Sequence, residues 1–223
     1  MSITLIFLLI VTILAVLVSL CALVLYFLDS KFVGILRGFG VYFSSILLIL
    51  AVFLSFIPEA SERIGIWLSL LIAFVAFIVF FLLVYLSDSY YRRGEYLLPR
   101  RRGHRIALFA TTLLKNICDG VIVGAAFSLS FAAGIIAITA LTAHEIPQKI
   151  GDAAVLRRAH YQKPKIIIYL TLISLTLPLV ATITWLSIGH SGAGAYIIAA
   201  GSGIFVYLAI RALSAVAKLF GNR

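Results

Sequence analysis

The chain has 223 residues, of which 63% are hydrophobic and only 12% are charged, and its formal net charge is +10. Apolar runs of about 18 or more residues recur along it, which argues against a soluble domain and predicts an all-α, polytopic membrane protein. The two cysteines, Cys21 and Cys118, lie in different apolar segments, so we expect free thiols and no disulfide framework.

The apolar runs predict a single transmembrane domain over residues 1–223, a bundle of about seven helices. The expected spans are 2–28, 39–57, 64–87, 105–127, 129–155, 165–188 and 193–218. Each approaches or exceeds the ~20 residues that cross a hydrocarbon core of ~30 Å. The first run is too long for a signal-peptide core and has no basic segment before it, so we expect a retained helix. Ser128 and Ser130 are the only polar residues that could form a turn between the fourth and fifth spans.

The basic residues concentrate in alternate loops, and the opposite loops hold one basic residue, Arg63. The basic loops and tail contain Lys31, Arg37, Arg92, Arg93, Arg100, Arg101, Arg102, Arg105, Lys149, Arg157, Arg158, Lys163, Lys165, Arg211, Lys218 and Arg223. The positive-inside rule then predicts an N-terminus outside the cell membrane, a cytosolic C-terminus and a long cytosolic loop at 88–104. The arginine run in that loop indicates topology and contact with anionic membrane lipid, and no nucleic-acid partner.

Two polar clusters interrupt the fourth and fifth spans. The first reads Lys-Asn-Ile-Cys-Asp-Gly over residues 115–120, and the second reads His-Glu-Ile-Pro-Gln over residues 144–148. A charged side chain at the centre of a bilayer costs about 2.5–3.5 kcal/mol on insertion scales, so such residues are candidates for a functional site. The polar residues of each cluster share one helix face, and the two antiparallel spans place them at a similar depth.

The side chains of these clusters suit a divalent metal ion. Asp119 and Glu145 supply two carboxylates, Asn116 and Gln148 supply neutral oxygens, and His144 supplies an imidazole. Mixed nitrogen and oxygen ligands suit zinc, iron or manganese. The metal would be a transported substrate, and we expect no prosthetic group.

A second interpretation involves no metal. Lys115 could form a structural ion pair with Asp119 and Glu145 in a membrane scaffold that transports nothing. An enzyme is not expected, because the sequence has no Ser/His/Asp arrangement and no activated nucleophile.

The same residues resemble a known family. Residues 144–152 are similar to the fifth-helix signature H-E-x-P-H-E-x-G-D of the ZIP metal transporters, and residues 115–120 resemble the fourth-helix motif H-N-x-x-D-G. Residues 56–60, Phe-Ile-Pro-Glu-Ala, resemble the L-L-P-E-A ending of the family's second helix. The fifth-helix motif is the most specific of these matches.

The resemblance implies an eight-helix fold that moves ions into the cytosol through a paired-metal site between helices four and five, often as a homodimer. Zinc is the expected ion. The implied metal ligands are Asn116, Asp119, His144, Glu145 and Gln148.

The chain departs from the family pattern at its site. Lys115 stands where the family has a metal-binding histidine, Gln148 replaces a histidine, and Lys149 replaces an acidic residue. We therefore expect Lys115 to modulate the site. The seven expected spans are also one fewer than the resemblance implies.

Overall fold

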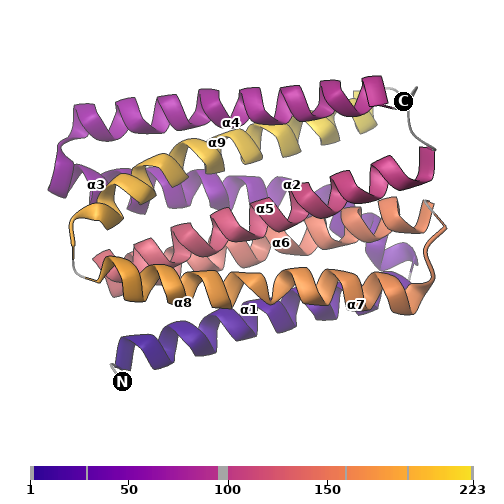
Figure 1. The fold of residues 1–223 in the computed structure, drawn as a ribbon, viewed down its shortest axis with the longest axis horizontal. Helices are drawn as coiled ribbons and strands as arrows, with labels where there is room; N and C mark the ends of the chain where they lie inside the picture. The colour runs from indigo at the N-terminus through magenta and orange to yellow at the C-terminus, as the bar shows by residue number, and fades with distance from the viewer. Residues whose placement is uncertain (1–2, 29, 95–99, 159, 190, 222–223) are drawn as a thin grey trace.

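The computed structural model describes residues 3–28, 30–94, 100–158, 160–189 and 191–221, and all regular structure in them is helical (Figure 1). The elements are α1 (Ile3–Leu28), α2 (Ser30–Ala51), the π-helical turn η1 (Val52–Phe56), α3 (Ile57–Ile64), α4 (Ile66–Gly94), α5 (Arg100–Leu129), α6 (Phe131–Arg158), α7 (Lys163–Ser174), α8 (Thr176–Ile188) and α9 (Ala193–Gly221). The predicted all-α class is confirmed.

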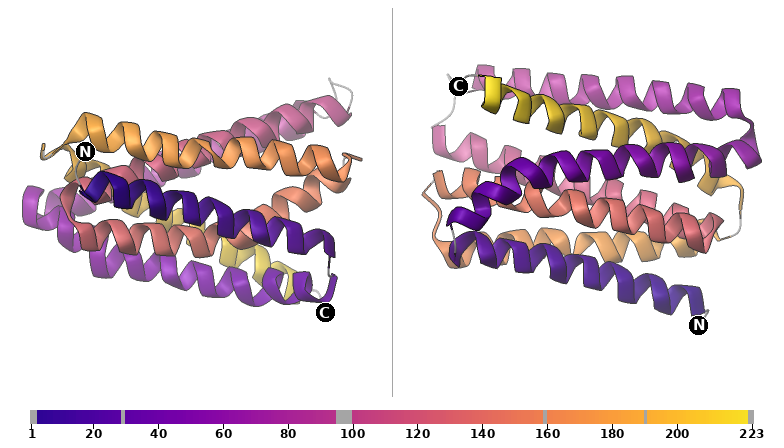
Figure 2. Two further views of the ribbon diagram at one scale, coloured as in Figure 1. Left: turned by 90° about the horizontal axis from the view of Figure 1, so that it is seen from below. Right: turned by 180° about the vertical axis from the view of Figure 1, so that it is seen from behind.

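The helices lie side by side along the long axis of the molecule (Figures 1 and 2). α5 packs against α6, α8 and α9, whereas α6 packs against α1, α2 and α5. α4 lies at the edge, against α3 and α9. In the most apolar stretch of the span Phe109–Leu129 on α5, 67% of the residues are buried. In the corresponding stretch of Ile66–Leu86 on α4, only 6% are buried. The two helices that carry the polar clusters are therefore in the interior.

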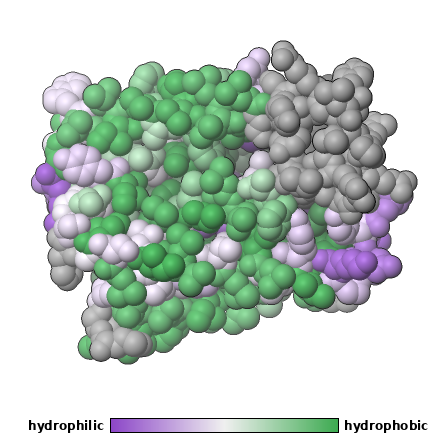
Figure 3. Space-filling view, viewed as in Figure 1, coloured by the Kyte–Doolittle hydropathy of each residue, from purple (hydrophilic) through white to green (hydrophobic). Residues whose placement is uncertain are grey.

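Six stretches of the described chain are long and apolar enough to cross a membrane. They are Ile3–Phe27, Phe39–Ile64, Ile66–Leu86, Phe109–Leu129, Lys163–Ile188 and Ala193–Ser214. α6 is not among them, because the polar cluster at its centre lowers its mean hydropathy. The outer face is apolar (Figure 3), and Trp67 and Phe74 on α4 are 83% and 65% exposed. A lipid environment accounts for such a surface, so the chain is a polytopic membrane bundle.

Glycines bring neighbouring helices close to backbone contact. A Cβ atom added to Gly124 would collide with the carbonyl oxygen of Ala181 on α8, and one added to Gly203 would collide with that of Ala73 on α4. Small residues at helix interfaces are a common device in membrane bundles, where van der Waals packing drives association. The α5–α8 and α4–α9 contacts therefore depend on these glycines.

The second span extends beyond its predicted end at residue 57. The π-turn η1 precedes Pro58, and the helix continues as α3 to Ile64. A proline has no N–H group and clashes with the carbonyl four residues before it. The wider π-turn accommodates Pro58 in the first turn of α3, and Gly65, with φ of 81°, ends the helix.

A second proline interrupts the span over residues 163–188. α7 and α8 are separated at Leu175, three residues before the buried Pro178. The ring of Pro178 is incompatible with a regular helical hydrogen bond to Ser174. The hydroxyls of Ser174 and Thr176 donate to carbonyl oxygens of α7 at 2.8 and 2.7 Å, which supports the broken turn.

The predicted loop over residues 88–104 is mostly helical. α4 continues to Gly94 and α5 already begins at Arg100, while residues 95–99 lie outside the described residues. The loop was predicted where the apolar composition ends, but the helices extend beyond that point. Polar residues such as Arg and Glu are good helix formers, so a helix can continue beyond the apolar segment.

We predict that Gly203→Ala destabilises the bundle by about 1–3 kcal/mol, because the new methyl group has to displace the backbone of α4. Gly151→Ala is the matched control, since Gly151 is also helical and has no atom within 4 Å of the added Cβ. The control should leave stability unchanged or raise it by about 0.5–1 kcal/mol through helix propensity. Thermal unfolding in detergent measures both changes. Equal unfolding temperatures for the two variants would contradict the packing described here.

Candidate metal site

The two polar clusters face each other across the α5–α6 interface. The turn predicted at Ser128 and Ser130 is present: α5 ends at Leu129, and the hydroxyl of Ser130 accepts a 3.1 Å hydrogen bond from the amide of Ala133 at the start of α6. This cap reverses the chain within one residue. It sets the centre of α5, at Lys115, opposite the centre of α6, at Glu145.

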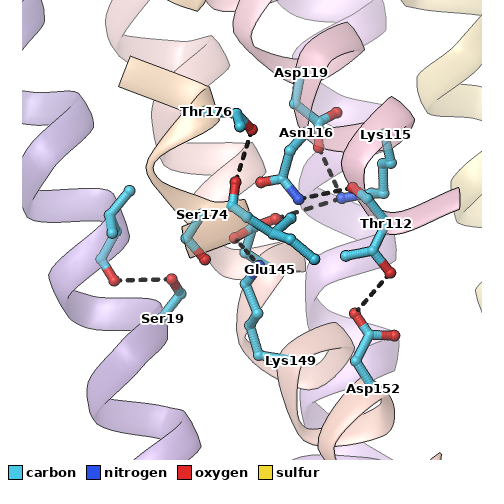
Figure 4. Close-up of polar contacts among 12 residues, drawn as sticks. Ser19, Thr112, Lys115, Asn116, Asp119, Glu145, Lys149, Asp152, Ser174 and Thr176 are labelled. Atoms are coloured by element: carbon cyan, nitrogen blue, oxygen red, sulfur yellow. Dashed lines mark hydrogen bonds and ion pairs between the residues drawn. The ribbon is translucent and has the colours of Figure 1, made fainter. Parts of the chain in front are cut away.

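Ion pairs join the two helices at this depth (Figure 4). Lys115 Nζ lies 2.8 Å from Asp119 Oδ2 on the same helix and 3.7 Å from Glu145 Oε1 on α6. Lys149 Nζ lies 3.6 Å from Glu145 Oε2. Each of the four side chains is at most 10% exposed. Two formal positive and two formal negative charges therefore balance each other in a buried site.

Asn116 and Thr112 extend this network along α5. The side-chain amide of Asn116 donates a 2.9 Å hydrogen bond to the carbonyl oxygen of Thr112 one turn earlier. The hydroxyl of Thr112 donates to Asp152 Oδ2 at 3.5 Å, the long limit for a hydrogen bond. The first of these bonds fixes the amide so that Asn116 Oδ1 is the atom left available.

Several buried polar atoms of the site have no hydrogen-bond partner in the described structure. They are Asn116 Oδ1, Asp119 Oδ1, His144 Nδ1, Glu145 Oε1 and Lys149 Nζ. Buried polar groups in proteins are almost always partnered, so a cluster of exceptions requires an explanation. Three of the five atoms are oxygens that can only accept hydrogen bonds or bind a cation, and a neutral imidazole nitrogen can do the same.

The predicted site residues do not all meet in one place. Among the described residues, Lys115, Asp119 and Glu145 are joined by ion pairs, whereas His144 and the half-buried Gln148 make no hydrogen bond to them. No three His, Cys, Asp or Glu side chains in the described part of the chain are close enough to hold a metal ion. The carboxylates of Asp119 and Glu145 are thus paired with lysines, which we call the lysine-paired arrangement. Binding a metal would require these side chains to move.

The break between α7 and α8 lies beside the site. A Cβ atom added to Gly120, the residue after Asp119, would be 3.0 Å from the carbonyl oxygen of Leu177 and 2.9 Å from Val180 Cβ. Discontinuous helices next to a polar site are a recurring feature of membrane transporters. Here the absence of a side chain at Gly120 brings the start of α8 to the level of the Asp119 carboxylate.

Lys149 was counted among the basic loop residues and as a departure from a family motif, but it lies within α6 and is fully buried at the site, so the loop assignment was wrong. Its spacing of four residues from Glu145 would have placed both side chains on one face of a helix. Thr112 was also not identified, although it is one turn before Asn116. Helical spacing was a sufficient signal for both residues.

Comparison with known proteins identifies the region that contains the site. The family model described as ZIP zinc transporter matches residues 98–219, more than half of the chain. The matched range includes both polar clusters and the α7–α8 break.

Individual relatives match the chain over a shorter range. It is 33% identical to the human zinc transporter ZIP6 over 99 residues, which is 44% of this chain and 13% of that protein. It is 32% identical to the zinc transporter foi of Drosophila melanogaster over 98 residues, 44% of this chain and 14% of the relative. The corresponding match to mouse zinc transporter ZIP4 is 34% over 96 residues, 43% of the chain and 14% of the relative. The chain thus matches only a small part of the length of these proteins.

Proposed function

The chain belongs to the ZIP zinc transporter family, and on that premise we propose that it moves a divalent metal cation across a membrane through the α5–α6 site. The observation that carries this proposal is the set of buried acceptor atoms on both helices that lack a hydrogen-bond partner in the described structure. Oxygens left without hydrogen bonds at bilayer depth are costly unless a cation satisfies them. The substrate is zinc, with iron or manganese as alternatives.

The proposed ligands are the five residues identified from the sequence. Asp119 and Glu145 balance the charge of a 2+ ion, Asn116 and Gln148 contribute amide oxygens, and His144 contributes a ring nitrogen. A donor set of nitrogen and oxygen without thiolate suits a first-row divalent ion. Because these side chains do not converge in the lysine-paired arrangement, binding brings them together around the ion.

Lys115 limits the site to a single metal. An ammonium group occupies the space and charge that a second cation would take. At ~5 Å and an effective dielectric constant of ~20, it repels a 2+ ion by roughly 6–7 kcal/mol before ligands compensate. The paired-metal site implied by the family resemblance is therefore replaced by one metal and one tethered ammonium.

One observation favours the alternative function, a membrane scaffold that transports nothing. Lys115 is already paired with Asp119 and Glu145, as a permanent structural network would require. Such a network leaves Asn116 Oδ1 and the second oxygen of Asp119 without partners, which a purely structural site has no reason to do. Metal binding distinguishes the two functions, since the scaffold binds none.

We propose transport toward the cytosol, with the N-terminus outside and the C-terminus inside the cell membrane. The support is the distribution of basic residues. Arg157, Arg158 and Lys163 are exposed near the α6–α7 turn, and the α5–α6 turn at the opposite end has no basic residue. The positive-inside rule assigns the basic end to the cytosol.

We expect Asp119→Asn and Glu145→Gln each to weaken zinc binding at least about 100-fold, because a single carboxylate then faces a 2+ ion beside the charge of Lys115. Glu62→Gln, at the exposed end of α3, is the matched control and should bind like the unmodified chain. Isothermal titration calorimetry of purified protein measures the affinities, and zinc uptake into proteoliposomes measures transport. Unchanged binding and uptake in both site variants would exclude this site.

The orientation predicts which end of the bundle reacts with an impermeant thiol reagent in intact cells. In a background with Cys21 and Cys118 replaced by alanine, a cysteine at position 62 should be labelled from outside. A cysteine at position 163, which is equally exposed, should be labelled only after the membrane is permeabilised. The reverse pattern would invert the proposed topology.

A further inference from the structure

Lys149 is a fully buried charge of the site, and the structure gives it only a loose partner. Its side chain is 0% exposed, and its Nζ atom lies 3.6 Å from Glu145 Oε2 without any hydrogen bond. An ammonium group has three donors, and leaving them unmet in a buried position is unfavourable. By contrast, Lys115 Nζ holds Asp119 Oδ2 at 2.8 Å. Of the two lysines, Lys149 is therefore the one whose ammonium group can leave its position more readily.

A second carboxylate lies within reach of Lys149 on the other side. Glu145 precedes it by four residues and Asp152 follows it by three, so all three side chains lie on one face of α6. Figure 4 shows Lys149 extending towards Glu145, with Asp152 further along α6 beside Thr112. The hydrogen bond that Thr112 donates to Asp152 is long, at 3.5 Å, so this carboxylate can still accept an ammonium donor.

We propose that the Lys149 ammonium occupies the cation position at Glu145 when no metal is bound and moves to Asp152 when a metal takes that position. The proposal rests on the function proposed above. Lys149 then acts as a positioning residue that competes with the metal for one carboxylate. Asp152 is its alternative partner and does not bind the metal.

This mechanism makes the effect of Asp152 conditional on Lys149. While Lys149 is present, the Asp152 carboxylate lowers the cost of moving the ammonium away from Glu145, and so it favours metal binding. Without Lys149 there is no ammonium to receive. A residue that acted directly on the metal, as a ligand or through its negative charge, would matter in both cases.

The test is a double-mutant cycle on the purified full chain, with zinc affinity measured by calorimetry. Lys149→Met should tighten zinc binding by about tenfold or more, because it removes a competing charge next to Glu145. Lys163→Met is the matched control at an exposed lysine and should change the affinity less than about twofold. Asp152→Asn should weaken binding by about tenfold in the native background, and it should have no effect when combined with Lys149→Met.

Lys149→Gln serves as a second variant if the methionine variant does not fold, and thermal unfolding in zinc-free buffer verifies folding. Weaker or unchanged zinc binding on removal of Lys149 would overturn the proposal. An equal loss from Asp152→Asn with and without Lys149 would also overturn it, since Asp152 would then act on the metal itself.

The same measurements separate this proposal from the transport function. If the unmodified chain binds no zinc while Lys149→Met does, the native chain is not a zinc carrier, yet Lys149 does occupy the site as proposed. If neither protein binds zinc, both proposals are wrong.

Discussion

The balance of charge around Glu145 is the constraint on which the rest of the site depends. Two lysines and two carboxylates lie buried in the centre of a bundle whose outer surface is apolar. Removing one partner of such a buried pair typically costs 3–5 kcal/mol, because the remaining charge is left uncompensated. The pairing of Lys115 with both Asp119 and Glu145 therefore ties α5 to α6 at the depth of the site. A metal ion that replaces an ammonium group there has to keep the positive and negative charges of the site in balance.

The two lysines and two carboxylates of the site lie between helices that pack closely against each other. Glycines on α5 allow α8 to come almost into backbone contact, and the α7–α8 break at Leu175 sets the start of α8 next to Asp119. The hydroxyls of Ser174 and Thr176 donate hydrogen bonds to carbonyl oxygens of α7. The break between α7 and α8 is therefore supported without a hydrogen bond from the metal site. The result is a site whose walls are fixed by close backbone contacts between helices.

Helical spacing was sufficient to place the two polar clusters opposite each other. Both clusters were expected at similar depth on antiparallel spans joined by a turn at Ser130, and the ion pair between Lys115 and Glu145 confirms that arrangement. The metal-binding roles of all five predicted ligands, Asn116, Asp119, His144, Glu145 and Gln148, stay predictions. The continuation of the second span through Pro58 could not be read from composition, because a π-turn depends on backbone geometry. The burial of Lys149 was not predicted, because its charge was assigned to a basic loop, although its spacing of four residues from Glu145 places both side chains on one helix face.

X-ray absorption at the zinc edge of the purified, zinc-loaded chain tests most directly whether a tethered ammonium takes the place of one metal. A single zinc with only oxygen and nitrogen neighbours at about 2.0–2.2 Å is the expected result. Scattering from a second metal at about 3.5–4 Å would contradict the replacement by Lys115. A sulfur shell at about 2.3 Å would place Cys118 or Cys21 at the metal and exclude the proposed ligand set.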